Sequence, residues 1–193
     1  MYINDIHIIY YVLVGILGLG VGQFVDWCNI RLPEYKKVFS KEFFTNYLKY
    51  LKPNYLLAFG TAIIYVLILY FVGWGTNLLN HLDLIKYLIL TPMLLSALMI
   101  DLKLQIIPNR LNLTIFEVGL VFTFLQGINN VSVGIDMLLG GLVGAGIFLL
   151  ITLIGGLIAG KEAMGFGDVK LMGAMGLFFG WMNIIAVSLI AFL

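Results

Sequence analysis

Six long apolar stretches constrain the fold of this chain more than any other feature. They cover approximately residues 6–30, 55–72, 84–100, 111–125, 133–159 and 169–193. A helix needs about 20 mostly apolar residues to cross a bilayer, and it satisfies its own backbone polar groups there. The 193-residue chain is 62% hydrophobic and 11% charged, whereas soluble domains carry about 25% charged residues. We therefore predict an all-α, multi-pass transmembrane bundle of about six spans.

Two of these stretches contain residues that lipid alone accommodates poorly. The third contains Pro92, and the short fourth stretch carries Glu117. We expect both to pack against protein on at least one face. At that depth Glu117 is a candidate supporting residue of a functional site. The alternative is a hydrogen bond that merely joins two helices.

The basic residues predict the orientation of the bundle. All but one of the 11 Lys and Arg residues lie in the loops after the first, third and fifth stretches, and the exception is Lys86. Cytoplasmic loops carry the excess of Lys and Arg. We therefore predict an N-terminus outside and these three loops in the cytoplasm.

The first of these loops, residues 31–54, predicts an interfacial amphipathic helix. An aromatic or aliphatic residue recurs every four positions from its middle onward, at Phe39, Phe43, Tyr47 and Leu51, as on one face of a helix. A solvated connector would leave this stripe exposed without a reason. We divide the chain into a first transmembrane helix (1–30), this cytoplasmic loop (31–54) and a transmembrane core (55–193).

The sequence offers few groups for metal or serine chemistry. It has one cysteine, Cys28, and two histidines far apart, His7 and His81, so we predict no metal site. It also lacks H-E-x-x-H and G-x-S-x-G motifs, which disfavours metal-dependent and serine hydrolysis. The net charge of +1 gives no reason to expect nucleic-acid binding. The remaining candidates for catalysis are the carboxylate side chains of aspartate and glutamate.

Two aspartates stand in distinctive surroundings at the predicted cytoplasmic ends of spans. Asp101 begins the segment D-L-K-L-Q-I-I-P-N, and Asp168 belongs to G-F-G-D-V-K at residues 165–170. Two carboxylates at ~4 Å repel each other by about 4 kcal/mol at an effective dielectric near 20, so they would share one proton at neutral pH. The ionised partner can then deprotonate a water while the protonated one polarises a peptide carbonyl.

Helix polarity suggests how the two roles divide. Asp168 would start the last helix, where the helix dipole favours an anion, and Asp101 would end the third, where the dipole disfavours it. We therefore predict Asp168 as the base and Asp101 as the acid. Gly165 and Gly167 permit unusual backbone torsions or close approach of a substrate.

Each motif also has a purely structural interpretation. A glycine turn followed by an aspartate cap begins many ordinary helices. Asp101 is equally compatible with a solvated charge paired with Lys103, and Pro108 with a simple turn into the next helix. Only the combination of motifs is specific.

This combination resembles the type IV prepilin peptidases, membrane aspartyl proteases of the G-x-G-D class. The match consists of Asp101, the I-P-N segment that includes Pro108 and Asn109, and, in the fifth loop, Gly165, Gly167, Asp168 and Lys170. A third match is G-Q-F-V-D-W-C-N-I-R-L-P at residues 22–33, which looks like the family's first-helix exit and makes Asp26 a further candidate site residue.

The resemblance implies a function. Members of this family sit in the bacterial cytoplasmic membrane and cleave the basic leader of prepilin-like precursors on the cytoplasmic side, with the residues matching Asp101 and Asp168 catalytic. Proteolysis needs no cofactor. Many members also methylate the new N-terminus with S-adenosylmethionine. Here the first loop lacks their paired C-x-x-C motifs, and Gln23 and Asp26 replace the usual Ser and Asn, so methylation stays open.

Two other classes of protein remain as alternatives. A small proton-coupled transporter would line a path with Asp26, Glu117, Asp136 and the two motif aspartates. A non-catalytic scaffold of a pilus or secretion assembly would tolerate Asp101→Asn and Asp168→Asn. The loop positions of the motif aspartates favour the peptidase.

Overall fold

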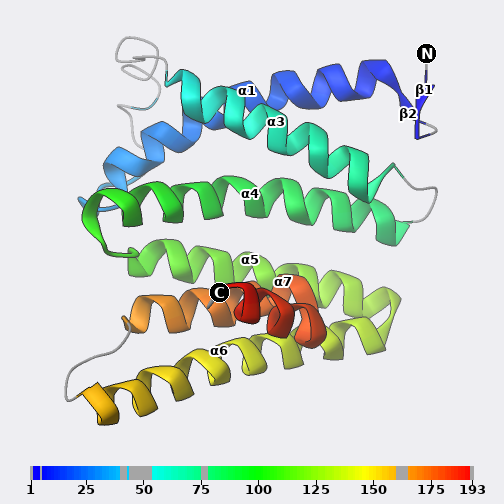
Figure 1. Ribbon diagram of the computed structural model, residues 1–193. Helices are drawn as coiled ribbons and strands as arrows, with labels where there is room; N and C mark the ends of the chain where they lie inside the picture. The colour runs from blue at the N-terminus through cyan, green and yellow to red at the C-terminus, as the bar shows by residue number, and fades with distance from the viewer. Residues whose placement is uncertain are drawn as a thin grey trace. The chain divides into compact units, whose positions relative to one another are not determined.

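The computed structural model describes residues 2–4, 6–39, 43, 54–74, 78–159 and 165–191. A short antiparallel hairpin of β1 (Tyr2–Ile3) and β2 (Ile6–His7) precedes the helices. Within the described residues, six helices are long and apolar enough to cross a membrane, which confirms the predicted fold class. They are α1 (Ile8–Arg31), α3 (Tyr55–Val72), α4 (Leu78–Leu104), α5 (Asn109–Asn129), α6 (Val131–Ala159) and α7 (Phe166–Ala191) (Figure 1).

The chain divides into two compact units, Met1–Gln105 and Ile106–Leu193. In the first unit, α1 and α3 pack through small residues. A Cβ atom on Gly18 would lie 2.6 Å from Ala62 Cα, and one on Gly22 would lie 2.7 Å from Ala58 Cα. Glycine at these positions therefore lets the two backbones touch, as in many membrane helix pairs.

Pro92 lies inside α4, where it cannot donate a backbone hydrogen bond to the carbonyl four residues earlier. That carbonyl belongs to Leu88, and the hydroxyl of Tyr65 on α3 donates to it at 2.6 Å. The side chain of Tyr65 is only 2% exposed. A neighbouring helix thus satisfies the group that proline leaves unpaired, in line with the expected protein neighbour.

The predicted interfacial helix falls largely outside the described residues. The residues that flank its start, Phe39 and Phe43, contact Phe24 of α1 with ring centroids 5.7 and 6.0 Å away. Phe43 also meets Trp27 edge-on. The start of the aromatic stripe therefore packs against the end of the first helix, and the interfacial helix itself stays a prediction.

In the second unit, α6 and α7 are in close contact along a stripe of glycines. A Cβ atom on Gly140 would lie 2.8 Å from Gly180 Cα, and one on Gly176 would lie 2.7 Å from Gly141 N. The glycine-rich part of α6 is therefore a helix-packing surface, as expected for glycines within an apolar span.

The helix α7 is broken at Gly180, which has φ 77° and ψ 170°. The part after the break turns back along the unit, from orange to red in Figure 1. Both parts of the helix contact Gly144 of α6, where a Cβ atom would lie 2.5 Å from the carbonyl oxygen of Met172, before the break, and 3.1 Å from Ile184 Cγ1, after it. The sequence predicted one uninterrupted span over residues 169–193. Hydropathy does not sense the positive φ that only glycine adopts easily.

Candidate active site

The G-x-G-D segment forms the start of α7. Asp168 lies in its first turn and is half-buried, and its backbone N–H donates to the carbonyl of Gly165 at 3.1 Å. A carboxylate at this position is stabilised by the N-terminal end of the helix dipole. Gly73 and Gly180 are the glycines with positive φ in the described part of the chain. The backbone torsions of Gly165 and Gly167 therefore do not require glycine, and a Cβ atom at either position would make only ordinary contacts, at 3.5 Å or more.

The I-P-N segment forms the start of α5 and packs directly against the G-x-G-D segment. Pro108 is the N-cap residue, and its carbonyl accepts from the N–H of Leu111 at 2.9 Å. A Cβ atom on Gly167 would lie 3.5 Å from Ile107 Cβ. Two motifs about 60 residues apart in the chain thus meet in one place.

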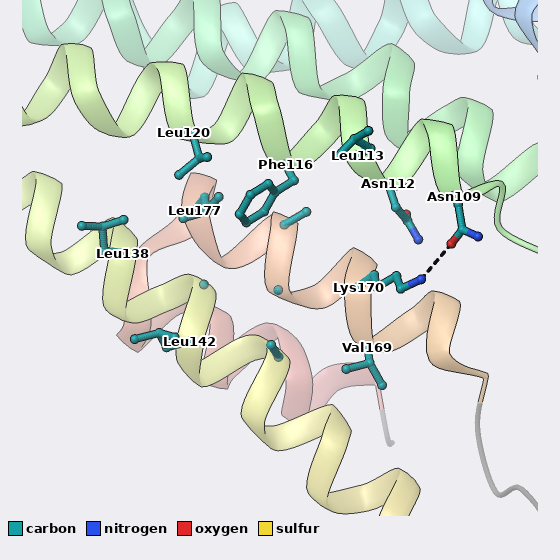
Figure 2. A pocket seen from close by; sticks show the side chains of 14 residues that line it. Asn109, Asn112, Leu113, Phe116, Leu120, Leu138, Leu142, Val169, Lys170 and Leu177 are labelled. Carbon is teal, nitrogen blue, oxygen red and sulfur yellow. Dashed lines mark hydrogen bonds between the residues drawn. The ribbon is translucent and has the colours of Figure 1, made fainter.

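Two hydrogen bonds fasten these segments to each other. The side-chain amide of Asn112 donates to the carbonyl of Gly167 at 2.9 Å, and the Lys170 ammonium donates to Asn109 Oδ1, also at 2.9 Å. Figure 2 shows the second of these bonds between α7 and α5. Lys170 and Asn109 of the predicted site are therefore brought together, beside Asp168.

Asn112 is a site residue that the sequence interpretation missed. It is 3% exposed, and its Oδ1 has no hydrogen-bond partner. Because its Nδ2 faces a carbonyl, which can only accept, the orientation of the amide is fixed. The sequence contained one signal for it, the spacing: Asn109 and Asn112 are three residues apart at the start of a mostly apolar helix, which places them on one face.

An apolar groove opens from this polar corner. Its volume is about 780 Å³. Asn109, Asn112 and Lys170 lie at one end, and the rest of the lining consists of aliphatic, aromatic and glycine residues of α5, α6 and α7 (Figure 2). The site therefore combines hydrogen-bonding groups with a long hydrophobic surface, an arrangement typical of ligand sites.

The other predicted site residues are described by their local surroundings. Asp101 is exposed in the last turns of α4, and its carbonyl accepts from the N–H of Gln105 at 2.7 Å. Asp26 on α1 accepts from the side chain of Asn54 at 2.9 Å. Glu117 is exposed on α5 and does not line the groove. Asp101 belongs to the first unit and Asp168 to the second, so their pairing stays a prediction.

The fold and the site define a helical membrane protein with an aspartate motif at the start of a span. Residues 88–193 match the model of the type IV leader peptidase family. The chain belongs to this family, and the resemblance seen in its motifs is confirmed.

Three relatives, each named prepilin leader peptidase/N-methyltransferase, illustrate the similarity. The protein from Aeromonas hydrophila is 34% identical over 119 residues, which are 62% of this chain and 37% of that protein. The one from Klebsiella pneumoniae is 33% identical over 142 residues, 73% of this chain and 58% of the relative. The protein from Neisseria gonorrhoeae is 29% identical over 137 residues, which are 71% of this chain and 44% of that protein. The chain thus spans less than two thirds of the length of these relatives. No solved structure matches it.

Proposed function

We propose that this chain is a membrane aspartic endopeptidase that cleaves the leader peptide of prepilin-like precursors. Asp101 and Asp168 would be its catalytic pair, at the cytoplasmic face of the bacterial cytoplasmic membrane. The observation that carries the proposal is the contact between the I-P-N and G-x-G-D segments, together with membership of the family. Asp101 precedes Ile107 by six residues, so the covalent chain keeps it within about 20 Å of that contact.

The proposed chemistry follows from one proton shared between two carboxylates. The ionised Asp168 takes a proton from water, and the resulting hydroxide attacks the carbonyl carbon of the scissile peptide. The protonated Asp101 donates to the carbonyl oxygen. When the tetrahedral diol collapses, the C–N bond breaks, Asp168 returns its proton to the leaving amine, and Asp101 takes back a proton from the diol hydroxyl that becomes the new carbonyl oxygen. No metal is needed for these steps.

The transporter alternative has less support from local contacts. Asp26 is held by Asn54, which also caps α3 through its side chain. Asp136 lies against the backbone of Gly180, where α7 breaks. Both acids therefore serve contacts within their own unit that explain their presence without a proton path.

Methylation is named in the relatives, but the proposal is limited to proteolysis. Gln23 and Asp26 stand where methylating members usually have Ser and Asn. In this chain both side chains hydrogen-bond to Asn54 and join α1 to α3. The side chains of Gln23 and Asp26 therefore serve a contact between two helices of the first unit.

The test is to incubate the purified protein in lipid nanodiscs with a prepilin-like precursor and to follow the precursor by mass spectrometry. We expect loss of the leader mass, and loss of cleavage in Asp101→Asn and in Asp168→Asn. The exposed Glu34, which pairs with Lys36, provides a matched control as Glu34→Gln. Full cleavage by either aspartate variant would exclude the proposed pair. Addition of S-adenosylmethionine, with a further methyl mass on the product, would extend the function.

A further inference from the structure

The groove beside the G-x-G-D segment extends along the whole of α5. A second hollow of about 560 Å³ between α5 and α6 shares Leu120 and Leu138 with the first and reaches Val131. The two together, which we call the α5–α6 groove, therefore run from one end of α5 to the other. At 1.5 Å per residue, the 21 residues of α5 extend over about 30 Å, which is the thickness of the hydrocarbon core.

The lining of the α5–α6 groove suits a helix. Gly141, Gly173 and Ala174 belong to its floor, where α6 packs against α7, and the larger apolar side chains form its walls. Leu113 and Leu142 on opposite walls are 57% and 72% exposed. A cylinder with apolar side chains would cover them.

The polar end of the α5–α6 groove coincides with the candidate active site. Val169 and Lys170, the residues that follow Asp168, line it. Asn112, which holds the Gly167 carbonyl, is also part of this end, and its Oδ1 lacks a donor. A helix in the groove would therefore have its apolar body between α5 and α6 and its end beside Asp168.

From this continuity we infer that the α5–α6 groove binds the apolar helix of the substrate and places the peptide bond preceding that helix at Asp168. The inference rests on the proposed function and adds the surface of this chain on which the apolar helix after the cleavage point would lie. A lipid acyl chain or a second copy of the protein would also find apolar contacts in the groove. Neither explains why the groove ends at the aspartate motif.

Site-specific cross-linking tests the inference. The full chain carries Cys28→Ser, to remove its single cysteine, and Asp168→Asn, to keep the substrate intact. One cysteine is then placed in the groove, as Leu142→Cys or Leu120→Cys, or on a neighbouring exposed face, as Leu139→Cys or Val121→Cys. The precursor has one cysteine in its apolar helix, and a short bis-maleimide joins the two. We expect several-fold higher yields at positions 142 and 120 than at 139 and 121.

Other outcomes would overturn the inference. Equal yields at groove and control positions would mean that the helix contacts the bundle unspecifically. If no cross-links form although the wild-type protein cleaves the same precursor, the substrate helix does not bind in the groove, and lipid fills it. Cross-links between two copies of the protein at position 142, unaffected by precursor, would assign it to self-association. Failure of wild-type cleavage would instead count against the proposed function, so the two failures are distinguishable.

A kinetic measurement provides a second readout. Leu142→Trp would fill the α5–α6 groove, whereas Leu139→Trp, three residues away, would not. We expect the first variant to raise KM several-fold with little change in kcat and in thermal stability, and the second to leave all three unchanged. An unchanged KM for a folded Leu142→Trp protein would contradict substrate binding in the groove.

Discussion

At the scale of single residues, Asn112 joins the two halves of the candidate site. It is buried, and its amide is the donor to the Gly167 carbonyl. Replacing it with leucine leaves that carbonyl without its donor, at a cost of about 1–3 kcal/mol. We expect Asn112→Leu to lower thermal stability and to reduce kcat more than KM, because the position of Asp168 is disturbed. Thr114→Ala, an exposed change on the same helix, is the control, and an equal loss there would contradict this role.

Gly167 allows the structural and the functional interpretations of the G-x-G-D glycines to be separated. A Cβ atom there would make an ordinary contact with Ile107, 3.5 Å away, and its φ is not positive. We therefore expect Gly167→Ala to fold with unchanged thermal stability. If the substrate passes against this backbone, the same variant will cleave the precursor many times more slowly. Unchanged cleavage would show that glycine is dispensable there.

At the scale of elements, α4 tolerates its proline only because α3 supplies a donor. Tyr65→Phe removes the hydroxyl that donates to the Leu88 carbonyl, at a cost of about 1 kcal/mol. Pro92→Ala restores a backbone N–H that can take its place. We expect a double-mutant cycle, measured by unfolding in detergent, to show that Tyr65→Phe costs almost nothing in the Pro92→Ala background. If the stability effects of the two substitutions are strictly additive, the Tyr65 hydroxyl does not compensate for the N–H that Pro92 lacks.

The break in α7 depends on one glycine and the acid beside it. A side chain at Gly180 would be strained by the positive φ, typically by about 1–3 kcal/mol, and would collide with the carboxylate of Asp136. We expect Gly180→Ala to lower thermal stability markedly. Gly146→Ala on α6 is the matched control, because a Cβ atom there meets nothing within 4 Å and helix propensity favours alanine. Equal stabilities of the two variants would show that the break is not required.

At the scale of the whole molecule, the sequence predicted elements better than it predicted how they meet. The span at residues 55–72 coincides with α3 because Asn54 and Gly73 mark its ends locally. The fourth span was placed at 111–125, yet α5 extends to Asn109 and Asn129, since polar residues lower hydropathy without ending a helix. The bond from Asn112 to Gly167 links residues 55 positions apart. No local pattern encodes such a contact, because it depends on how α5 packs against α7.

Orientation in the membrane is the remaining whole-molecule prediction, and it decides which side of the membrane the site faces. Ser132 in the first turn of α6 and Gln105 between α4 and α5 are both exposed and lie at opposite ends of α5. If the basic loops are cytoplasmic, an impermeant maleimide will label Ser132→Cys on intact cells, and Gln105→Cys only after permeabilisation. Both variants carry Cys28→Ser. The reverse pattern would place Asp168 outside, away from precursors that still carry their leader.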